Sequence, residues 1–268
     1  MSLLQIIVIA LVQGITEFLP ISSSGHLILV PVLTGWKDQG LIVDVMVHMG
    51  SFLAVLVYFW RDILHMLMGV LNLLRGRMTA SGRLALMIII ATIPAVGFGL
   101  FMKFSGLQDA IRGPLIVTIN AVLFGIIMWL ADRYGPQRRG AEELGIGPAF
   151  LVGLAQAVAI IPGVSRSGIT MSAGRMLGLT RVEAARFSFL LGIPAIAGAG
   201  VLVLGEAMSN GVSITSDAIL AGVLTFFVAL AAIAFLMRVI TRVGLLPFVL
   251  YRFALAALLA GLMWWGII

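Results

Sequence analysis

The chain has 268 residues, of which 61% are hydrophobic and only 10% are charged, and its mean hydropathy is +1.16. A soluble domain carries about 25% charged residues, so this composition excludes a water-exposed globular surface. The formal net charge is +6, but the basic residues lie in short segments between apolar runs, which is typical of membrane topology and not of a nucleic-acid-binding face.

The apolar segments fall into two classes by length. Six are long enough to span a bilayer, and they cover roughly 41–60, 83–102, 113–131, 185–204, 217–237 and 244–266. The others, roughly 2–20, 23–34, 147–162 and 167–179, form two pairs, each interrupted by a Pro, Ser and Gly cluster that breaks a helix. Broken backbone at membrane depth is tolerated only inside protein or along a wet cavity, so each pair is predicted to be a re-entrant helical hairpin.

The two interrupted pairs align without a gap at an offset of 143 residues. The shared Ser-x-Ser-Gly sequence begins at Ser22 in the first pair and at Ser165 in the second. This alignment predicts one all-α polytopic membrane domain over 1–268, with repeats at about 1–140 and 141–268. Each repeat is expected to be a re-entrant hairpin followed by three transmembrane helices, and the odd number of spans makes the second copy inverted.

The charged residues predict the orientation of this domain. Arginines gather in the loops 61–83, 132–146 and 238–243, which are therefore expected on the cytoplasmic side. The stretch 103–112 holds only Lys103 and Arg112, and the loop 205–216 holds Glu206 and no basic residue, so both are expected outside. Both termini then face out, and the two hairpin turns meet near the midplane.

Polar residues flank the first hairpin turn. Gln13 and Glu17 are four residues apart and share a helix face, where their oxygens could hold Mg²⁺ or Ca²⁺. Alternatively, Glu17 acts as a base toward a hydroxyl or water, or pairs with an arginine to close the fold. His26 follows Ser22, Ser23 and Ser24, and it is expected to move a proton or to make a hydrogen bond between helices.

The second hairpin turn predicts an anion-binding cradle. Ser165, Ser167 and Thr170 supply hydroxyls, and Arg166 supplies a planar cation suited to phosphate oxygens. The helix that follows would point free N–H groups at the same ligand. Serine and glycine are also common at packed membrane helices, but packing does not explain an arginine in this cluster.

Further ionisable residues occur in the spanning segments. Asp44 and His48 share a helix face and are expected either behind the site or in a buried structural pair. Arg252 is expected to neutralise a carboxylate, to reach the phosphate, or to extend toward water. The remaining arginines of the second half are expected at the cytoplasmic edge, and they include Arg175, Arg181 and Arg186.

At these two motifs the sequence resembles the undecaprenyl-diphosphate phosphatase family of the bacitracin-resistance type. The family's (Glu/Gln)-x-x-x-Glu motif is matched by Gln13 and Glu17, and its Pro-Gly-x-Ser-Arg-Ser-x-x-Thr motif is matched from Pro162 to Thr170. The resemblance covers essentially the whole chain, including the segments 59–61 and 251–253. Members often carry Glu where this chain has Gln13.

The resemblance implies hydrolysis of undecaprenyl diphosphate to undecaprenyl phosphate and inorganic phosphate, with a divalent cation, Mg²⁺ or Ca²⁺, as cofactor. It implies a multi-pass protein of the bacterial cytoplasmic (inner) membrane, competition by bacitracin that sequesters the substrate, and a possible homodimer. Carried over by motif, the catalytic positions are Glu17, His26, Ser23 and Arg166, and the phosphate-binding positions are Ser22, Ser24, Ser165, Arg166, Ser167, Thr170 and Arg252.

A transporter or flippase of a phosphorylated lipid or another anion is the alternative function. Inverted repeats with broken helices that meet at the midplane are also typical of transporters. In that case the anion cradle would bind the substrate without cleaving it, and Glu17 and His26 would carry coupled protons.

Overall fold

The computed structural model describes residues 1–107, 113–209 and 213–268, and within them the chain is helical, with no β-strand. The helices are α1 (Leu3–Thr16), α2 (Ser23–Thr34), α3 (Leu41–Tyr58), α4 (Trp60–Leu74), α5 (Ala80–Ser105), α7 (Pro114–Tyr134), η1 (Ala141–Glu143), α8 (Ile146–Val158), α9 (Arg166–Met176), α10 (Arg181–Ser209), α11 (Ser216–Val243) and α12 (Leu246–Trp264). Arg112 and part of the predicted outer loop 205–216, with the Glu206 side chain, lie outside this description.

Six of the described helices, α3, α5, α7, α10, α11 and α12, are long and apolar enough to cross a membrane. They correspond to the six segments predicted from hydropathy. Large apolar side chains on their outer faces are exposed, as expected for surfaces that contact lipid instead of water. The protein is therefore an all-α, multi-pass membrane protein.

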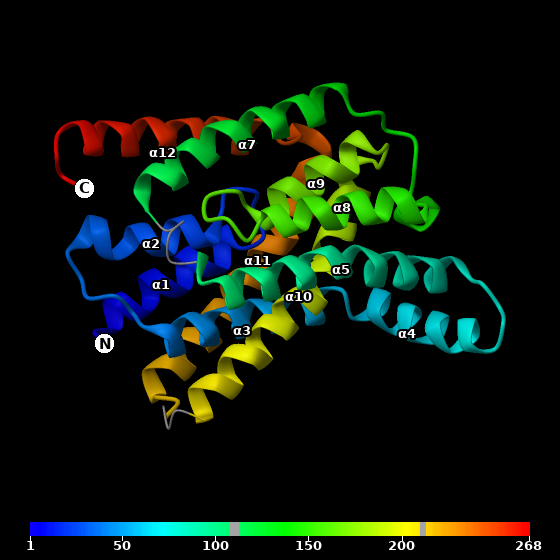
Figure 1. The fold of residues 1–268 in the computed structure, drawn as a ribbon, viewed down its shortest axis with the longest axis horizontal. Helices are drawn as coiled ribbons and strands as arrows, with labels where there is room; N and C mark the ends of the chain where they lie inside the picture. Colours follow the sequence, from blue (N-terminus) through cyan, green and yellow to red (C-terminus); the bar gives the residue numbers. More distant parts are fainter. Residues whose placement is uncertain (108–112, 210–212) are drawn as a thin grey trace.

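The short helices form two hairpins, α1/α2 and α8/α9, whose turns meet in the middle of the molecule. In Figure 1, α1 and α2 lie toward the end that holds both termini, while α8 and α9 approach from the opposite end. The turns are in contact, because Ser167 Oγ donates a hydrogen bond of 3.2 Å to the Leu19 carbonyl. The structure thus shows the predicted hairpins, while the inversion of the whole second half stays a prediction.

The segment 61–83 is not the loop that the sequence analysis expected. Most of it is helix α4, which is too short to span a membrane and packs along α5. The two helices approach so closely at Gly69 that a Cβ there would collide with the backbone of Gly82. The hydropathy criterion missed α4 because its polar residues interrupt the apolar run, although its apolar side chains recur along one face.

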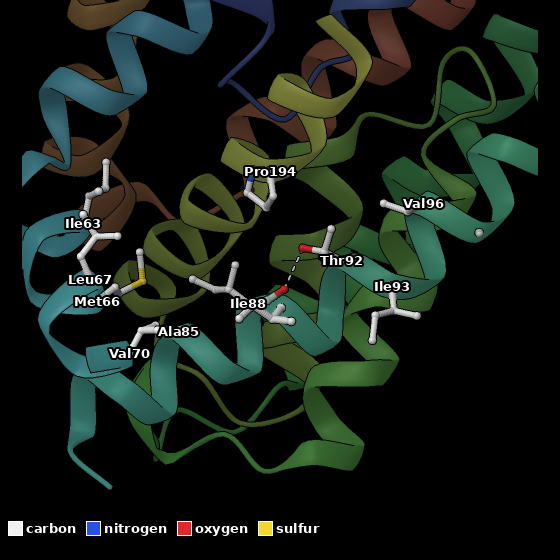
Figure 2. A pocket seen from close by; sticks show the side chains of 12 residues that line it. Ile63, Met66, Leu67, Val70, Ala85, Ile88, Thr92, Ile93, Val96 and Pro194 are labelled. Carbon is white, nitrogen blue, oxygen red and sulfur yellow. Dashed lines mark hydrogen bonds between the residues drawn. The ribbon is translucent and has the colours of Figure 1, made fainter. Parts of the chain in front are cut away.

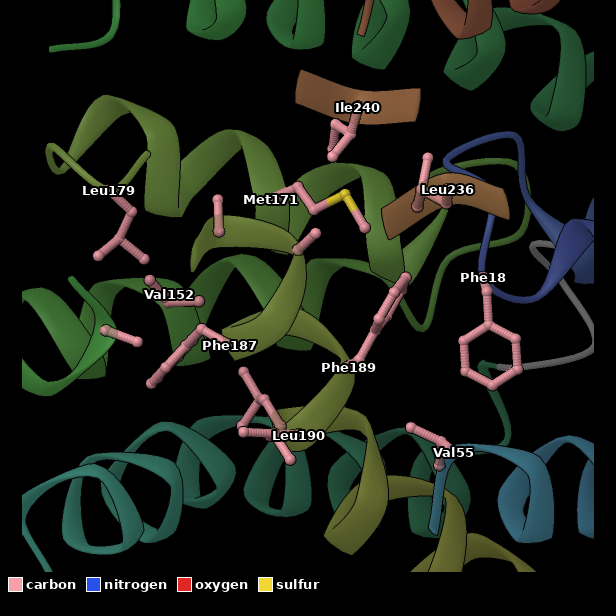
Figure 3. Packing of buried hydrophobic residues seen from close by; sticks show 14 of the residues in the cluster. Phe18, Val55, Val152, Met171, Leu179, Phe187, Phe189, Leu190, Leu236 and Ile240 are labelled. Atoms are coloured by element: carbon pink, nitrogen blue, oxygen red, sulfur yellow. The ribbon is translucent and has the colours of Figure 1, made fainter. Parts of the chain in front are cut away.

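Helix α10 forms the centre of the apolar core (Figure 3). Its Phe189 meets Phe18 edge to face at a centroid distance of 5.3 Å and Phe59 at 6.0 Å. Phe18 is the residue that follows Glu17, and it is 1% exposed. The core therefore anchors the first hairpin turn directly against α10.

Charged residues tie the arginine-rich end of the molecule together. Arg186 pairs with Asp62 of α4 and with Glu142 of η1, the latter at 2.7 Å, so it links three separate segments. Arg181 pairs with Asp132 at 2.7 Å. Arg175 belongs to the same cluster, 3.6 Å from Asp132, but it is 1% exposed and donates to backbone carbonyls at the end of α7 and after α9.

Candidate functional site

The two hairpin turns have the same backbone geometry at their equivalent serines. Ser22 and Ser165 are the only described non-glycine residues with positive φ, at 76° and 71°. Each begins the following helix, and each side chain accepts a backbone N–H hydrogen bond three residues on, from Gly25 at 3.4 Å and from Gly168 at 3.2 Å. Positive φ is unfavourable for a residue with a Cβ, so the N-cap hydrogen bond holds a strained turn in place.

The Glu17 carboxylate joins the two turns. It accepts hydrogen bonds from Arg166 Nη2 at 2.9 Å, from Ser23 Oγ at 2.5 Å and from Gln13 Nε2 at 3.1 Å. Glu17 is 8% exposed, so its charge is offset by a guanidinium and by two neutral donors within a largely buried setting. Residues 149 positions apart in the sequence therefore form one polar cluster.

This cluster opens onto a cavity of about 530 Å³. One wall is polar and includes Glu17, Ser24, Asp44, His48 and Arg166. The apolar part of the lining comes from the segment that follows α8 and from α10, and also from α2 and α3. The cavity can therefore accept a ligand with a charged head and an apolar body.

Asp44 and His48 lie on the cavity wall, as their helical spacing suggested. His48 Nε2 is 3.8 Å from the Glu17 carboxylate, and Nδ1 lies 2.7 Å from the Asp44 carbonyl, to which it must donate. Asp44 Oδ1 accepts a hydrogen bond of 2.8 Å from Gln39. Both residues thus lie beside the site and add one carboxylate and one imidazole to its polar wall.

Arg166 has donor capacity left after it pairs with Glu17. Its buried Nη1 atom has no hydrogen-bond partner among the described residues. The guanidinium lies against the backbone of α10 at Gly192, where any Cβ would collide with it. An unpaired buried donor is unfavourable, and Arg166 also lines the cavity, where its guanidinium is the kind of group that binds phosphate oxygens.

Most hydroxyls of the predicted anion cradle are already used within the protein. Ser167 donates to the Leu19 carbonyl, Thr170 donates to the Arg166 carbonyl at 2.7 Å and meets Ser188 Oγ at 2.6 Å, and Ser165 caps α9. All three predicted side chains are at least 95% buried. In this structure they support the turn that carries Arg166, and phosphate binding by these three residues stays a prediction.

The serines of the first turn divide in the same way. Ser22 is buried and caps α2, so it is a support and not part of the cavity wall. Ser24 is exposed and lines the cavity, and Ser23 is half-buried beside Glu17. Of the hydroxyls predicted to bind phosphate or attack it, Ser24 lines the cavity, and Ser23 contacts the Glu17 carboxylate that lines it.

His26 does not line the cavity among the described residues. Its Nδ1 lies 2.7 Å from the Ser22 carbonyl and its Nε2 lies 2.7 Å from the Tyr251 hydroxyl. A carbonyl can only accept, so Nδ1 carries the hydrogen and the neutral ring accepts at Nε2. His26 therefore links α2 to α12, which is the helix-to-helix alternative of the sequence analysis.

Arg252 has a different environment from each of those predicted. It is 1% exposed, and its guanidinium donates to the carbonyls of Gly163, Asn120 and Ala121 at 2.8, 2.9 and 3.2 Å. Among the described residues it pairs with no carboxylate and does not line the cavity, and its Nε and Nη2 donate to carbonyls at the second turn and in α7. Arg252 thus holds the second hairpin turn in place against α7.

Sequence reasoning missed four residues that hold the turns. Asn120 donates to the Pro162 carbonyl at 2.7 Å, Ser51 accepts from Gln13 at 3.4 Å, Ser188 meets Thr170, and Tyr251 meets His26. Each lies on a spanning helix far from its partner in the sequence. A single polar residue in an apolar helix carries no motif, so no local signal identifies its partner.

Comparisons with known proteins agree with this architecture. The family model described as "Bacitracin resistance protein BacA" matches residues 6–258. A protein of Maricaulis maris named undecaprenyl-diphosphatase is 51% identical over 260 residues, covering 95% of this chain and 97% of the relative. Proteins with the same name from Ruegeria pomeroyi and Alcanivorax borkumensis are 46% and 45% identical, covering 98% and 97% of this chain and 99% and 98% of their own lengths.

Proposed function

The chain belongs to the bacitracin resistance protein BacA family, and from this premise we propose that Glu17, Ser23 and Arg166 carry out its reaction. The protein is an integral membrane phosphatase that hydrolyses undecaprenyl diphosphate to undecaprenyl phosphate and inorganic phosphate, recycling the lipid carrier of cell-wall synthesis. The observation that carries the residue assignment is the contact of Arg166 and Ser23 with one Glu17 carboxylate at the cavity wall.

The diphosphate head group is proposed to bind at the polar wall. Arg166 would donate to the terminal phosphoryl oxygens, where negative charge increases in the transition state. A guanidinium fixed by the Glu17 carboxylate and by the backbone of α10 requires little reorganisation when the substrate arrives. Ser24, which also lines the cavity, would donate a further hydrogen bond to the diphosphate.

Ser23 is proposed as the nucleophile. Its Oγ would attack the terminal phosphorus while Glu17 accepts the hydroxyl proton and the anhydride bond breaks, releasing undecaprenyl phosphate with the bonding electron pair. Glu17 would pass this proton to the departing phosphate or to solvent. Water would then attack the phosphoserine and lose a proton to the Glu17 carboxylate, which returns it to the Ser23 oxygen as inorganic phosphate is released. Direct attack by a water that loses its proton to Glu17 is the alternative. Rapid quenching of turnover with labelled substrate distinguishes them, because only the first path leaves label on Ser23.

A divalent cation, Mg²⁺ or Ca²⁺, is proposed as a partner of Glu17 and Gln13. Gln13 Oε1 is buried without a hydrogen-bond partner in the described structure, next to the Glu17 carboxylate. The described residues contain no cluster of three or more metal-binding side chains, so the diphosphate oxygens would complete the coordination, as is usual for Mg²⁺. The cation would supply positive charge that offsets the diphosphate.

The cellular setting of the reaction is proposed from the same family membership. The cytoplasmic (inner) membrane of a bacterium is where the lipid carrier is used, and bacitracin would slow turnover by sequestering the lipid diphosphate. A homodimer stays a prediction. Transport of a phosphorylated lipid is not favoured by the names of the relatives, and it predicts binding of the diphosphate without release of phosphate.

Phosphate release from undecaprenyl diphosphate by the purified protein in detergent tests the proposal. Glu17→Ala should remove most activity, whereas Glu143→Ala, which changes an exposed carboxylate of η1, should leave it unchanged. Chelation by EDTA followed by addition of Mg²⁺ or Ca²⁺ tests the cation. Full activity of Glu17→Ala would contradict the assignment of the site, and binding without phosphate release by the unmodified protein would favour transport.

A further inference from the structure

A second large hollow in the molecule is an apolar groove of about 640 Å³ between α4, α5 and α10 (Figure 2). Of the described residues that line it, only Thr92 has a polar side chain, and its hydroxyl donates to the Ile88 carbonyl of its own helix at 2.8 Å. The groove therefore offers no hydrogen-bonding group to a ligand. It is shaped for a hydrocarbon.

The groove and the phosphatase cavity share walls at two places. On α10, Pro194 lines the groove while the next two residues, Ala195 and Ile196, line the cavity. On α5, Gly97 lines the groove, and a Cβ at Gly99, two residues on, would lie 3.6 Å from Ile160, which lines the cavity. Neighbouring residues of α10 thus line the two hollows, and α5 lies beside both.

Helices α5 and α10 carry small residues near both hollows. Nothing lies within 4 Å of the position that a Cβ would take at Gly97 or at Gly198. The cavity residues on this side, Ala195 and Ala199, are also small. A chain of hydrocarbon would therefore meet no bulky side chain where it passes these exposed positions on α5 and α10.

The chemistry of the substrate requires such a path. The head group of a lipid diphosphate belongs at the polar wall, beside Glu17 and Arg166, while its tail cannot remain among carboxylates or extend into water. The apolar cavity residues of α10 lead from the polar residues toward the groove, because Pro194 of the groove directly precedes Ala195 of the cavity lining.

We propose that the groove between α4, α5 and α10 is the binding site for the polyprenyl tail of the substrate, which reaches it from the cavity between α5 and α10. The proposal rests on the lipid diphosphatase function given above. Residues on the outer rim of the groove, such as Leu67 and Ile93, are 57% and 59% exposed, so the tail would continue from the groove into the bilayer. The groove would select the tail by van der Waals packing, because bilayer lipid and the groove are equally apolar and the hydrophobic effect does not favour one over the other.

Gly97→Phe tests the proposal by filling the groove from a position with open space around it. We compare kcat/KM for undecaprenyl diphosphate and for farnesyl diphosphate, whose short tail does not need the groove. Gly147→Phe on α8 is the matched control, since Gly147 is also an exposed helical glycine with open space and lines neither hollow. Leu67→Trp adds bulk from α4, on the other side of the groove.

Both groove variants should lower kcat/KM for undecaprenyl diphosphate about tenfold and leave the value for farnesyl diphosphate within about twofold, through a higher KM. Equal values for the long substrate in Gly97→Phe and Gly147→Phe would overturn the proposal and would assign the groove to ordinary bilayer lipids. Equal loss with both substrates would also overturn it, as a general effect on the fold. If the unmodified protein cleaves neither substrate, the result contradicts the phosphatase function itself and is distinct from a failure of the groove proposal.

A binding measurement does not depend on catalysis. The chain has no cysteine, so Ile93→Cys introduces a single thiol at the groove, and Leu123→Cys introduces one on a lipid-exposed face of α7. Undecaprenyl phosphate should slow labelling of the first thiol by N-phenylmaleimide several-fold and leave the second unchanged, whereas farnesyl phosphate should protect neither. Equal labelling of Ile93→Cys with and without undecaprenyl phosphate would contradict the proposal.

Discussion

The two hairpin turns use one backbone frame for different purposes. Ser22 and Ser165 have nearly the same φ and make the same N-cap hydrogen bond, and each is followed by a residue that reaches the Glu17 carboxylate. At an offset of 143, that residue is Ser23 in the first turn and Arg166 in the second. Equivalent positions thus place a hydroxyl and a guanidinium on the same carboxylate.

The turns differ in what their other polar residues do. The first turn carries the carboxylate, whereas the position equivalent to Glu17 in the second half is Ile160, which lines the apolar wall of the cavity. The second turn is instead held by buried polar contacts from Arg252 and Asn120. The two turns therefore have the same backbone geometry because their sequences are equivalent. Their chemistry differs because it depends on side chains that the two halves do not share.

Replacing Arg166 should have the largest effect, because this residue is the second turn's contribution to the reaction. Arg166→Ala is expected to lower kcat/KM by about a thousandfold, since the Glu17 carboxylate loses its counter-charge and the phosphoryl group loses its donor. Arg166→Lys should restore little, because an ammonium cannot hold Glu17 and a phosphate oxygen with the same planar geometry. Phosphate release under initial-rate conditions measures both.

Arg238→Ala is the control for this prediction, because Arg238 is exposed on α11 and lies far from both turns in the sequence. If Arg166→Lys kept nearly full activity, a positive charge without the planar guanidinium geometry would be enough for catalysis. The second turn would then contribute no directional hydrogen bond, and the contrast between the two turns would be weaker than the geometry suggests.

Ser23→Ala tests the first turn's contribution. A loss of at least about a hundredfold in kcat is expected if Ser23 is the nucleophile, because a water must then replace it beside Glu17. Ser24→Ala, one residue on and also at the cavity, should cost about tenfold or less, the loss of one hydrogen bond to substrate. If Ser24→Ala proved the more damaging of the two, the roles of the neighbouring serines would have to be exchanged.

Removing a contact that supports the second turn should lower the stability of the protein more than it lowers the catalytic rate. Arg252→Met keeps an apolar chain in place but leaves the carbonyls of Gly163, Asn120 and Ala121 without their donor. The expected loss is roughly 2 to 3 kcal/mol of unfolding free energy, read as a lower midpoint of thermal unfolding in detergent. His26→Phe, which removes the corresponding link between α2 and Tyr251, should cost less because that contact is partly exposed.

Activity separates the support role of Arg252 from a phosphate-binding role. A supporting residue should leave KM for undecaprenyl diphosphate within about twofold at a temperature where the variant is folded. A KM raised tenfold or more in folded Arg252→Met would restore the interpretation that this arginine binds phosphate.

Sequence patterns predicted the parts of this molecule that depend on local chemistry. Hydropathy identified the six spans, and the Pro, Ser and Gly clusters identified both turns. Both features can be recognised from a short stretch of sequence, because a span needs a continuous apolar run and a broken helix needs helix-breaking residues. The spacing of Gln13 and Glu17 likewise predicted a shared helix face. The association of Glu17 with Arg166 followed only from the premise that the turns meet.

The direction of individual side chains could not be predicted in this way. Ser165, Ser167 and Thr170 belong to an apparent phosphate motif, yet they turn toward Leu19, Ser188 and their own helix. Whether a hydroxyl faces a cavity or a carbonyl depends on the neighbouring helix, and that helix is distant in sequence. Helix α4 was missed for another reason, because its polar residues interrupt the apolar run although its apolar side chains recur along one face.

The smallest effects are expected at the capping serines, and they test whether the two turns really are equivalent. Ser22→Gly and Ser165→Gly relieve the cost of positive φ, about 1 kcal/mol, while losing the cap costs a few tenths, so stability should change little. Ser22→Ala and Ser165→Ala keep the unfavourable φ and lose the cap, so each should be less stable by about 1 to 2 kcal/mol. Thermal unfolding of the four variants should give the same order in both turns. A Gly variant with normal stability but lost activity in only one turn would show that its serine hydroxyl acts on the substrate there, and the two turns would then differ in chemistry even at their most similar residue.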